Sequence, residues 1–186
     1  MGPRWRERFR DRRLATVRVS ARRARGGIGD LLLVSHHVIV LILLLHGLSA
    51  FLLLGAVTHQ ALALWMPAGR QEPGWWHSLR SVHPERYVRA VVVLFCLTAL
   101  LGAINYSPFR VFARAQFLDT QVPWATGLFE VKEHATAIGL AVLPSYWAVW
   151  REPNGVSARR AFTTLLTAVA WWNFFVGHVV NNVRGL

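Results

Sequence analysis

The feature that most constrains this chain is a long apolar stretch, residues 31–66, which contains no Asp, Glu, Lys or Arg. A helix needs about 20 apolar residues to cross the hydrocarbon core of a membrane, and this stretch is longer. Three more apolar segments follow, at residues 87–106, 124–150 and 160–181. A polar loop is expected at residues 70–86, and a loop with a short surface helix at residues 107–122. Pro123 is expected to be the first residue of the third helix. Charged residues make up only 16% of the chain, against 54% hydrophobic residues, which is too few to cover a soluble globule. The sequence therefore predicts an all-α integral membrane protein, a four-helix bundle.

The positive charge is concentrated before the first apolar segment. Ten of the 21 Lys and Arg residues lie in the first 25 positions. Cytoplasmic segments next to membrane spans carry such an excess, so residues 1–29 are predicted to be a basic cytoplasmic tail on anionic lipid. Nucleic-acid binding is not expected, because that function spreads basic charge over a folded face. Residues 30–186 then form the four-span domain of a multi-pass bacterial inner-membrane protein.

Several function classes are excluded by residue content. Cys96 is the only cysteine, so neither a disulfide scaffold nor a zinc ribbon can form. The sequence contains no G-x-S-x-G, P-loop, G-x-G-x-x-G or H-E-x-x-H motif. An enzymatic role is left open only as the membrane electron-transfer subunit of an oxidoreductase.

Ionisable residues inside predicted spans are functional candidates, because burying them in lipid is costly. The helical rise places the candidates of three spans at similar depth, roughly 9–15 Å from the cytoplasmic end. A fourth candidate, His46, lies deeper, with Gly47 beside it to admit a ring or a helix. The full set of polar candidates is His36, His37, His46, His59, Cys96, Glu130, Lys132, Glu133, His134, Asn173 and His178.

Glu130 and His134 are four residues apart and share one helix face. The carboxylate of Glu130 is expected to orient the His134 ring, accept its proton or bind a metal beside it. Lys132 is expected to project elsewhere, toward the membrane surface. Two structural explanations stay open: the acidic residues start a helix outside the hydrocarbon, or the histidines are satisfied by ordinary hydrogen bonds.

Two neutral imidazoles facing each other from different helices bind haem b. The candidate ligands are His134 paired with His178 or His46, with His59 as an option on the outer side. His46 and His59 are 13 residues apart, about 220° around a helix, so at most one haem is expected. The hydrophobic layout with scattered histidines resembles the small four-helix b-type cytochrome membrane proteins. That resemblance implies electron transfer between a partner subunit and quinone.

Two alternatives remain from the sequence. His37, Glu130, His134 and His178 offer mixed nitrogen and oxygen ligands for a non-haem metal, or a proton path. The chain is otherwise a cofactor-free structural or assembly subunit of a larger membrane complex. The preferred hypothesis is a redox-linked membrane subunit that binds one haem b or another metal and contacts lipid, partner subunits and quinone.

Overall fold

The computed structural model describes residues 37–66 and 74–185. Residues 42–186 form one compact unit, which the following paragraphs describe. The other unit, Met1–Leu41, is described only from residue 37 on. The predicted basic tail, residues 1–29, lies outside the described residues.

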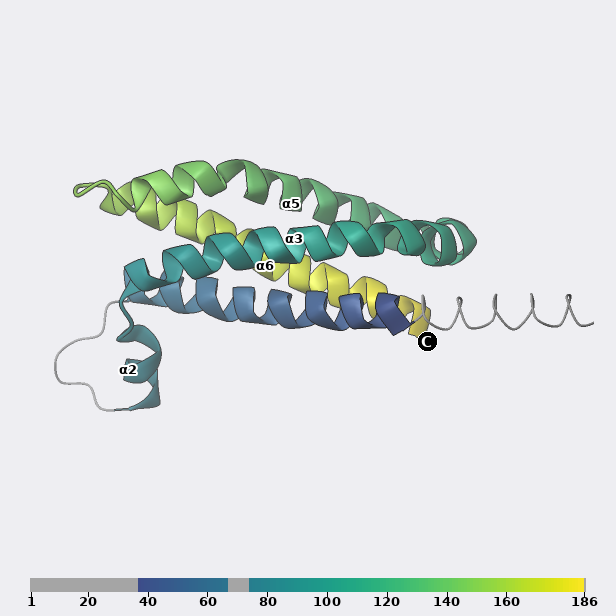
Figure 1. Cartoon of the computed structure of the whole chain (residues 1–186), viewed down its shortest axis with the longest axis horizontal. Helices are drawn as coiled ribbons and strands as arrows, with labels where there is room; N and C mark the ends of the chain where they lie inside the picture. The colour runs from purple at the N-terminus through teal and green to yellow at the C-terminus, as the bar shows by residue number, and fades with distance from the viewer. Residues whose placement is uncertain (1–36, 67–73, 186) are drawn as a thin grey trace, which may run out of the picture. The chain divides into compact units, whose positions relative to one another are not determined.

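Regular structure is helical throughout the described residues, which confirms the all-α prediction. Figure 1 shows the helices in chain order. We call His37–Trp65 the N-terminal helix. It is followed by α2 (Trp75–Arg80), the short 3-10 helix η1 (Pro84–Arg86), α3 (Tyr87–Phe109), the π-helix η2 (Arg110–Leu118), α4 (Asp119–Gln121), α5 (Pro123–Val149) and α6 (Val156–Gly185).

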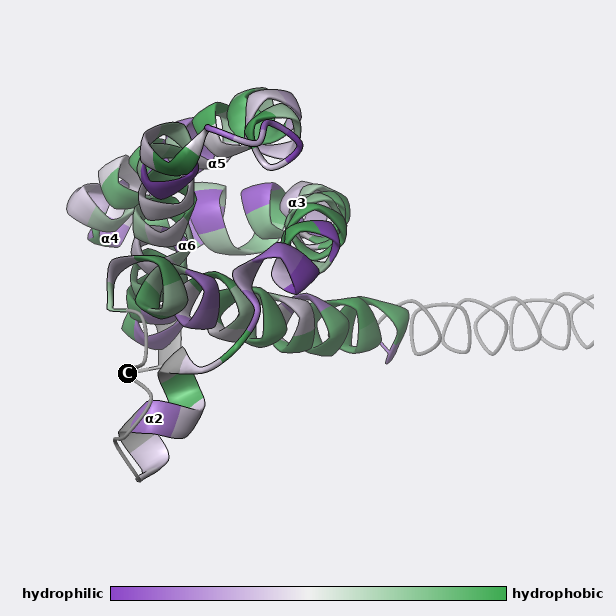
Figure 2. Cartoon of the chain, turned by 90° about the vertical axis from the view of Figure 1, so that its left-hand side faces the viewer, coloured by the Kyte–Doolittle hydropathy of each residue, from purple (hydrophilic) through white to green (hydrophobic). Residues whose placement is uncertain are grey.

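Three of the described helices are long and apolar enough to cross a membrane: His37–Trp65, Pro84–Gln121 and Val156–Val183. Their outer faces carry large apolar side chains, such as Leu44 and Phe51, each 65% exposed. Figure 2 shows this hydrophobic colouring along the long helices. Exposed apolar surface on this scale suits lipid rather than water. The chain is therefore a candidate multi-pass membrane protein.

The predicted third span corresponds to α5, which is not one of these three helices. Its 27 residues are long enough, and it begins at Pro123, the predicted first residue. Its N-terminal half contains Glu130, Lys132, Glu133 and His134, which lower its hydropathy. Three apolar spans are therefore supported rather than the four predicted.

Two predicted loops are wrong in part. Residues 107–122 were expected as a loop carrying a short surface helix, but α3 continues to Phe109 and passes into η2 and α4. Pro108 lies two residues before η2; it lacks a backbone donor and its ring crowds the preceding turn, which favours a departure from α geometry. The expected polar loop at residues 70–86 contains α2 and η1.

The main core joins the N-terminal helix to α3, α5 and α6 and includes Val57, Val91, Phe95, Leu143 and Leu166. Gly139 of α5 admits Phe95 of α3 so closely that an added Cβ would lie 2.2 Å from Phe95 Cζ. A smaller core of Leu118, Ala125, Val176 and Val180 packs η2 against α5 and α6. These cores bring polar residues of four helices to the positions described next.

Candidate functional site

His46 of the N-terminal helix is fixed against α3. Its Nδ1 donates to the Thr98 carbonyl oxygen at 3.0 Å, and Thr98 Oγ1 donates to Ser49 Oγ at 3.0 Å. Because a carbonyl oxygen only accepts, the proton lies on Nδ1 and the lone pair on Nε2. Metal-binding histidines are commonly held in this way.

The glycine beside the His46 ring is not Gly47, as the sequence suggested, but Gly102 of α3. An added Cβ at Gly102 would lie 3.1 Å from His46 Cε1, whereas Gly47 faces open space. The close approach of ring and backbone is therefore made between helices and not within one.

Lys132 points into the bundle, which is opposite to the sequence prediction. Its Cε lies 3.7 Å from the position of a Cβ on Gly177 of α6, and its Nζ lies 5.2 Å from the Phe129 ring centroid. In the part of the chain that the structure describes, no carboxylate lies within ion-pair distance of Lys132 Nζ.

The contacts between α5 and α6 establish an antiparallel register. Asn173 Nδ2 of α6 donates to Thr136 Oγ1 of α5 at 3.0 Å. Four residues further along α6, Gly177 meets Lys132, four residues earlier in α5. The pairs Lys132–Thr136 and Asn173–Gly177 therefore form the facing stripes of the two helices.

The contacts of α3 place His46 at the same level. Phe95 of α3 meets Gly139, and Phe109 stacks on Phe129 with centroids 4.4 Å apart. Gly102 lies midway between these two phenylalanines, so it is level with the part of α5 around Lys132. Since Gly102 touches His46, all four long helices meet at this level. We call the six residues of this region the polar layer: His46, Ser49, Thr98, Lys132, Thr136 and Asn173.

Two polar atoms in and beside the polar layer lack partners. Asn173 Oδ1 and Asn105 Nδ2 are buried and make no hydrogen bond within the described residues. Buried polar atoms are nearly always paired, so each exception calls for an explanation. Asn105 follows Gly102 by three residues and lies on the stripe of α3 that faces the same interior.

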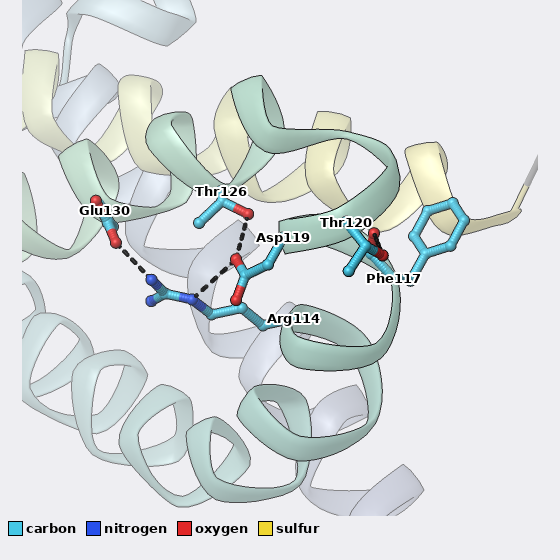
Figure 3. Close-up of polar contacts among 6 residues, drawn as sticks. All are labelled: Arg114, Phe117, Asp119, Thr120, Thr126 and Glu130. Atoms are coloured by element: carbon cyan, nitrogen blue, oxygen red, sulfur yellow. Dashed lines mark hydrogen bonds and ion pairs between the residues drawn. The ribbon is translucent and has the colours of Figure 1, made fainter.

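The Glu130 side chain forms an ion pair with Arg114 rather than with His134. Figure 3 shows Arg114 of η2 between two carboxylates. Its Nη2 lies 2.5 Å from Glu130 Oε1, and its Nε lies 3.4 Å from Asp119 Oδ1. Thr126 Oγ1 donates to Asp119 Oδ1 at 2.8 Å. This network connects the π-helical turn to the start of α5. The sequence suggested a different role for Glu130, as a proton acceptor or metal ligand.

His134 is exposed and donates from Nδ1 to the Glu130 main-chain oxygen at 2.7 Å. It lies about 200° around α5 from both Lys132 and Thr136, which face α6. His134 therefore points away from α6, and the structure does not bring it to face His178.

His178 is exposed on α6, where its Nε2 accepts from Asn182 Nδ2 at 3.0 Å. It lies five turns beyond Arg160, which donates to the Leu64 carbonyl oxygen of the N-terminal helix. Trp171 of α6 likewise donates to Thr58. Extending this antiparallel register puts His178 on the stripe of α6 that faces the N-terminal helix, level with residues 46–51.

The other predicted ligands lie elsewhere. His59 Nδ1 donates to the Leu79 carbonyl oxygen at 3.2 Å, and its ring stacks with Tyr87, so it holds α2 in place. His37 belongs to the other unit and is not placed relative to residues 42–186. Across residues 37–66 and 74–185, no three His, Cys, Asp or Glu side chains gather into a metal-binding group.

A second buried polar cluster escaped the sequence analysis. Tyr146 Oη donates to Gln60 Oε1 at 2.7 Å, and Gln60 Nε2 donates to the Pro84 carbonyl oxygen at 3.0 Å. Both side chains are 0% exposed. We call this the closed cluster. The sequence signal for the closed cluster is Gln60, a polar residue in an otherwise apolar segment. The sequence signal for the inward direction of Lys132 is Thr136, which follows four residues later.

No protein-family model, curated protein or solved structure matches this chain.

Proposed function

We propose that this chain is a membrane subunit of a redox-linked system, with four crossing helices and a cytoplasmic N-terminus in a bacterial inner membrane. In addition to the three apolar helices, the proposal includes α5 as a span, which is 27 residues long, about 40 Å. It runs antiparallel to α6 and packs on α3 through Gly139, so it lies alongside the apolar spans. The basic tail supports the orientation.

The observation that carries the proposal is His46 in the polar layer. Its Nδ1–H bond to Thr98 fixes the ring and leaves Nε2 with a lone pair inside a bundle whose outer faces are apolar. An ionisable group in that setting is costly and therefore a functional candidate. A ligand to haem b needs this tautomer and this orientation.

His178 is the favoured second ligand. It lies on the stripe of α6 that faces the N-terminal helix, near the level of His46, while His134 points away from α6. To bind iron, His178 Nε2 must release Asn182 Nδ2, which is exposed and can pair with water or lipid. A haem b held by these two rings would carry one electron at a time between a partner subunit and quinone.

Partner subunits are supported by the outward polar residues of α5. Glu133 and His134 are exposed on a helix that the proposal places in the membrane. Polar groups at such positions avoid lipid by facing another protein chain. Lipid covers the remaining apolar faces, and His134 marks the surface where a partner subunit docks.

The test is a dithionite-reduced minus oxidised visible spectrum of protein purified with its native partners, together with metal analysis. We expect reduced α and Soret bands that are lost in His46→Ala and His178→Ala but kept in His83→Ala, whose side chain is 66% exposed. Absence of bands and of metal contradicts the proposal and supports a cofactor-free structural subunit. Stoichiometric metal without bands, lost in Glu130→Gln, supports the non-haem site.

A further inference from the structure

Next to the polar layer, on the side of η2, hydrogen-bond donors without partners lie beside a group of aromatic rings. Lys132 Nζ lies 5.2 Å from the Phe129 ring centroid. Phe129 in turn stacks on Phe109 and Tyr106 of α3, with centroids 4.4 and 6.1 Å away. Side chains of a helix lean toward its N-terminus, so the Lys132 ammonium lies near the level of Phe129. The cation therefore lies beside a group of aromatic rings where α5 meets both α3 and α6.

Asn105 supplies a second donor on the face of α3 that contains Phe109. It belongs to the α3 stripe of Thr98, Gly102 and Phe109, whose spacing of three and four residues keeps them on one face. Two of these residues touch His46, and Phe109 touches Phe129. Asn105 Nδ2 is buried and makes no hydrogen bond within the described residues. The site thus offers N–H groups from two helices that make no hydrogen bond within the described residues.

These groups match the chemistry of a ligand that is flat, apolar enough to enter from lipid, and carries oxygen acceptors on its ring. We propose that Lys132 and Asn105 bind the head group of a membrane quinone, donating to its carbonyl oxygens, with the ring against Phe129. This deepens the proposed redox function and rests on it for the choice of a redox-active ligand. Lys132 also stabilises any negative charge on the ring oxygens, because it has no acidic partner among the described residues.

The test is equilibrium binding of ubiquinone-1 to the detergent-purified full chain by isothermal titration calorimetry. Lys132→Met keeps the length and packing of the side chain but removes its charge and donors. We expect it to weaken binding about tenfold or more, the usual effect of losing a hydrogen bond to a charged group. Lys132→Arg is expected to restore binding to within about threefold, since the cation and its donors are retained. Asn105→Leu is expected to weaken binding by about fivefold.

Ser81→Ala, at an exposed residue outside the site, is the matched control and is expected to bind like the unmodified chain. Equal ubiquinone-1 binding by Lys132→Met and the unmodified chain overturns the inference, as does the absence of saturable binding. The two proposals fail separately. Quinone binding that depends on Lys132, without haem bands, overturns only the haem proposal, and haem bands without quinone binding overturn only this site.

Discussion

Two polar clusters lie within the same helices and differ in how completely their hydrogen bonds are made. In the closed cluster, Tyr146 donates to Gln60, which donates to the Pro84 carbonyl oxygen, and both side chains are fully buried. In the polar layer, Asn173 Oδ1 has no partner and Lys132 no carboxylate among the described residues. The closed cluster is explained by folding alone. The polar layer is not, because folding favours paired or apolar groups at such positions.

The largest loss of stability is expected where the closed cluster is broken. Gln60→Leu removes the acceptor of Tyr146 and the donor to Pro84, leaving both buried groups unpaired. This should cost about 1–3 kcal/mol. Thermal unfolding in detergent measures it, and Tyr146→Phe added to Gln60→Leu should cost little more, since the two residues act as a pair. A double variant that loses the full sum of the two single effects would contradict a shared network.

The opposite sign is expected for the polar layer. Lys132→Met removes a charge that has no acidic partner among the described residues and should raise stability by about 1 kcal/mol. The same unfolding assay measures this gain. A loss as large as that of Gln60→Leu would mean that Lys132 is a structural residue, and the contrast between the clusters would disappear.

A smaller change is expected at Asn173. Its Nδ2 donates to Thr136 Oγ1, but Thr136 also donates to the Lys132 main-chain oxygen and so keeps a partner. Asn173→Leu removes an unpaired oxygen together with one hydrogen bond, and the two effects should cancel to within about 0.5 kcal/mol. Destabilisation by about 2 kcal/mol or more would show that the hydrogen bonds of the polar layer are as completely made as those of the closed cluster.

A similarly small effect, which depends on salt, is expected in the network of Figure 3. Glu130 is 48% and Asp119 43% exposed, so screening weakens their ion pairs with Arg114. Arg114→Met should cost less than about 1 kcal/mol at low salt. The cost should shrink further in high salt, which unfolding at two ionic strengths would detect. A salt-independent loss would show that Arg114 acts through packing.

The sequence predicts where the helices lie along the chain better than it predicts which face of each helix meets a neighbour. The apolar segments at residues 31–66 and 160–181 correspond to long helices, and Pro123 begins α5 as expected, because length, composition and proline geometry are local properties. The continuation of α3 into η2 was not expected, since a proline usually indicates a boundary. Pro108 changes the helix type here instead of ending it.

The direction of each candidate side chain depends on which helices become neighbours. Lys132 points inward because Gly177 of α6 leaves room for it, and Glu130 is paired with Arg114 because η2 folds back on α5. Neither contact is encoded by spacing within one segment. The sequence singles out His46 as a candidate, but its partners, Thr98 and Gly102, come from a helix about fifty residues later in the chain.

The most direct test of the open polar layer is a thermal shift with ubiquinone-1 added in excess to three proteins. A ligand that binds only the folded state raises the unfolding temperature by an amount that grows with the logarithm of its concentration relative to its dissociation constant. We predict the same increase for the unmodified chain and for Gln60→Leu, although the latter starts lower, and little or no increase for Lys132→Met. An equal increase in all three proteins, or none in any, would contradict the account.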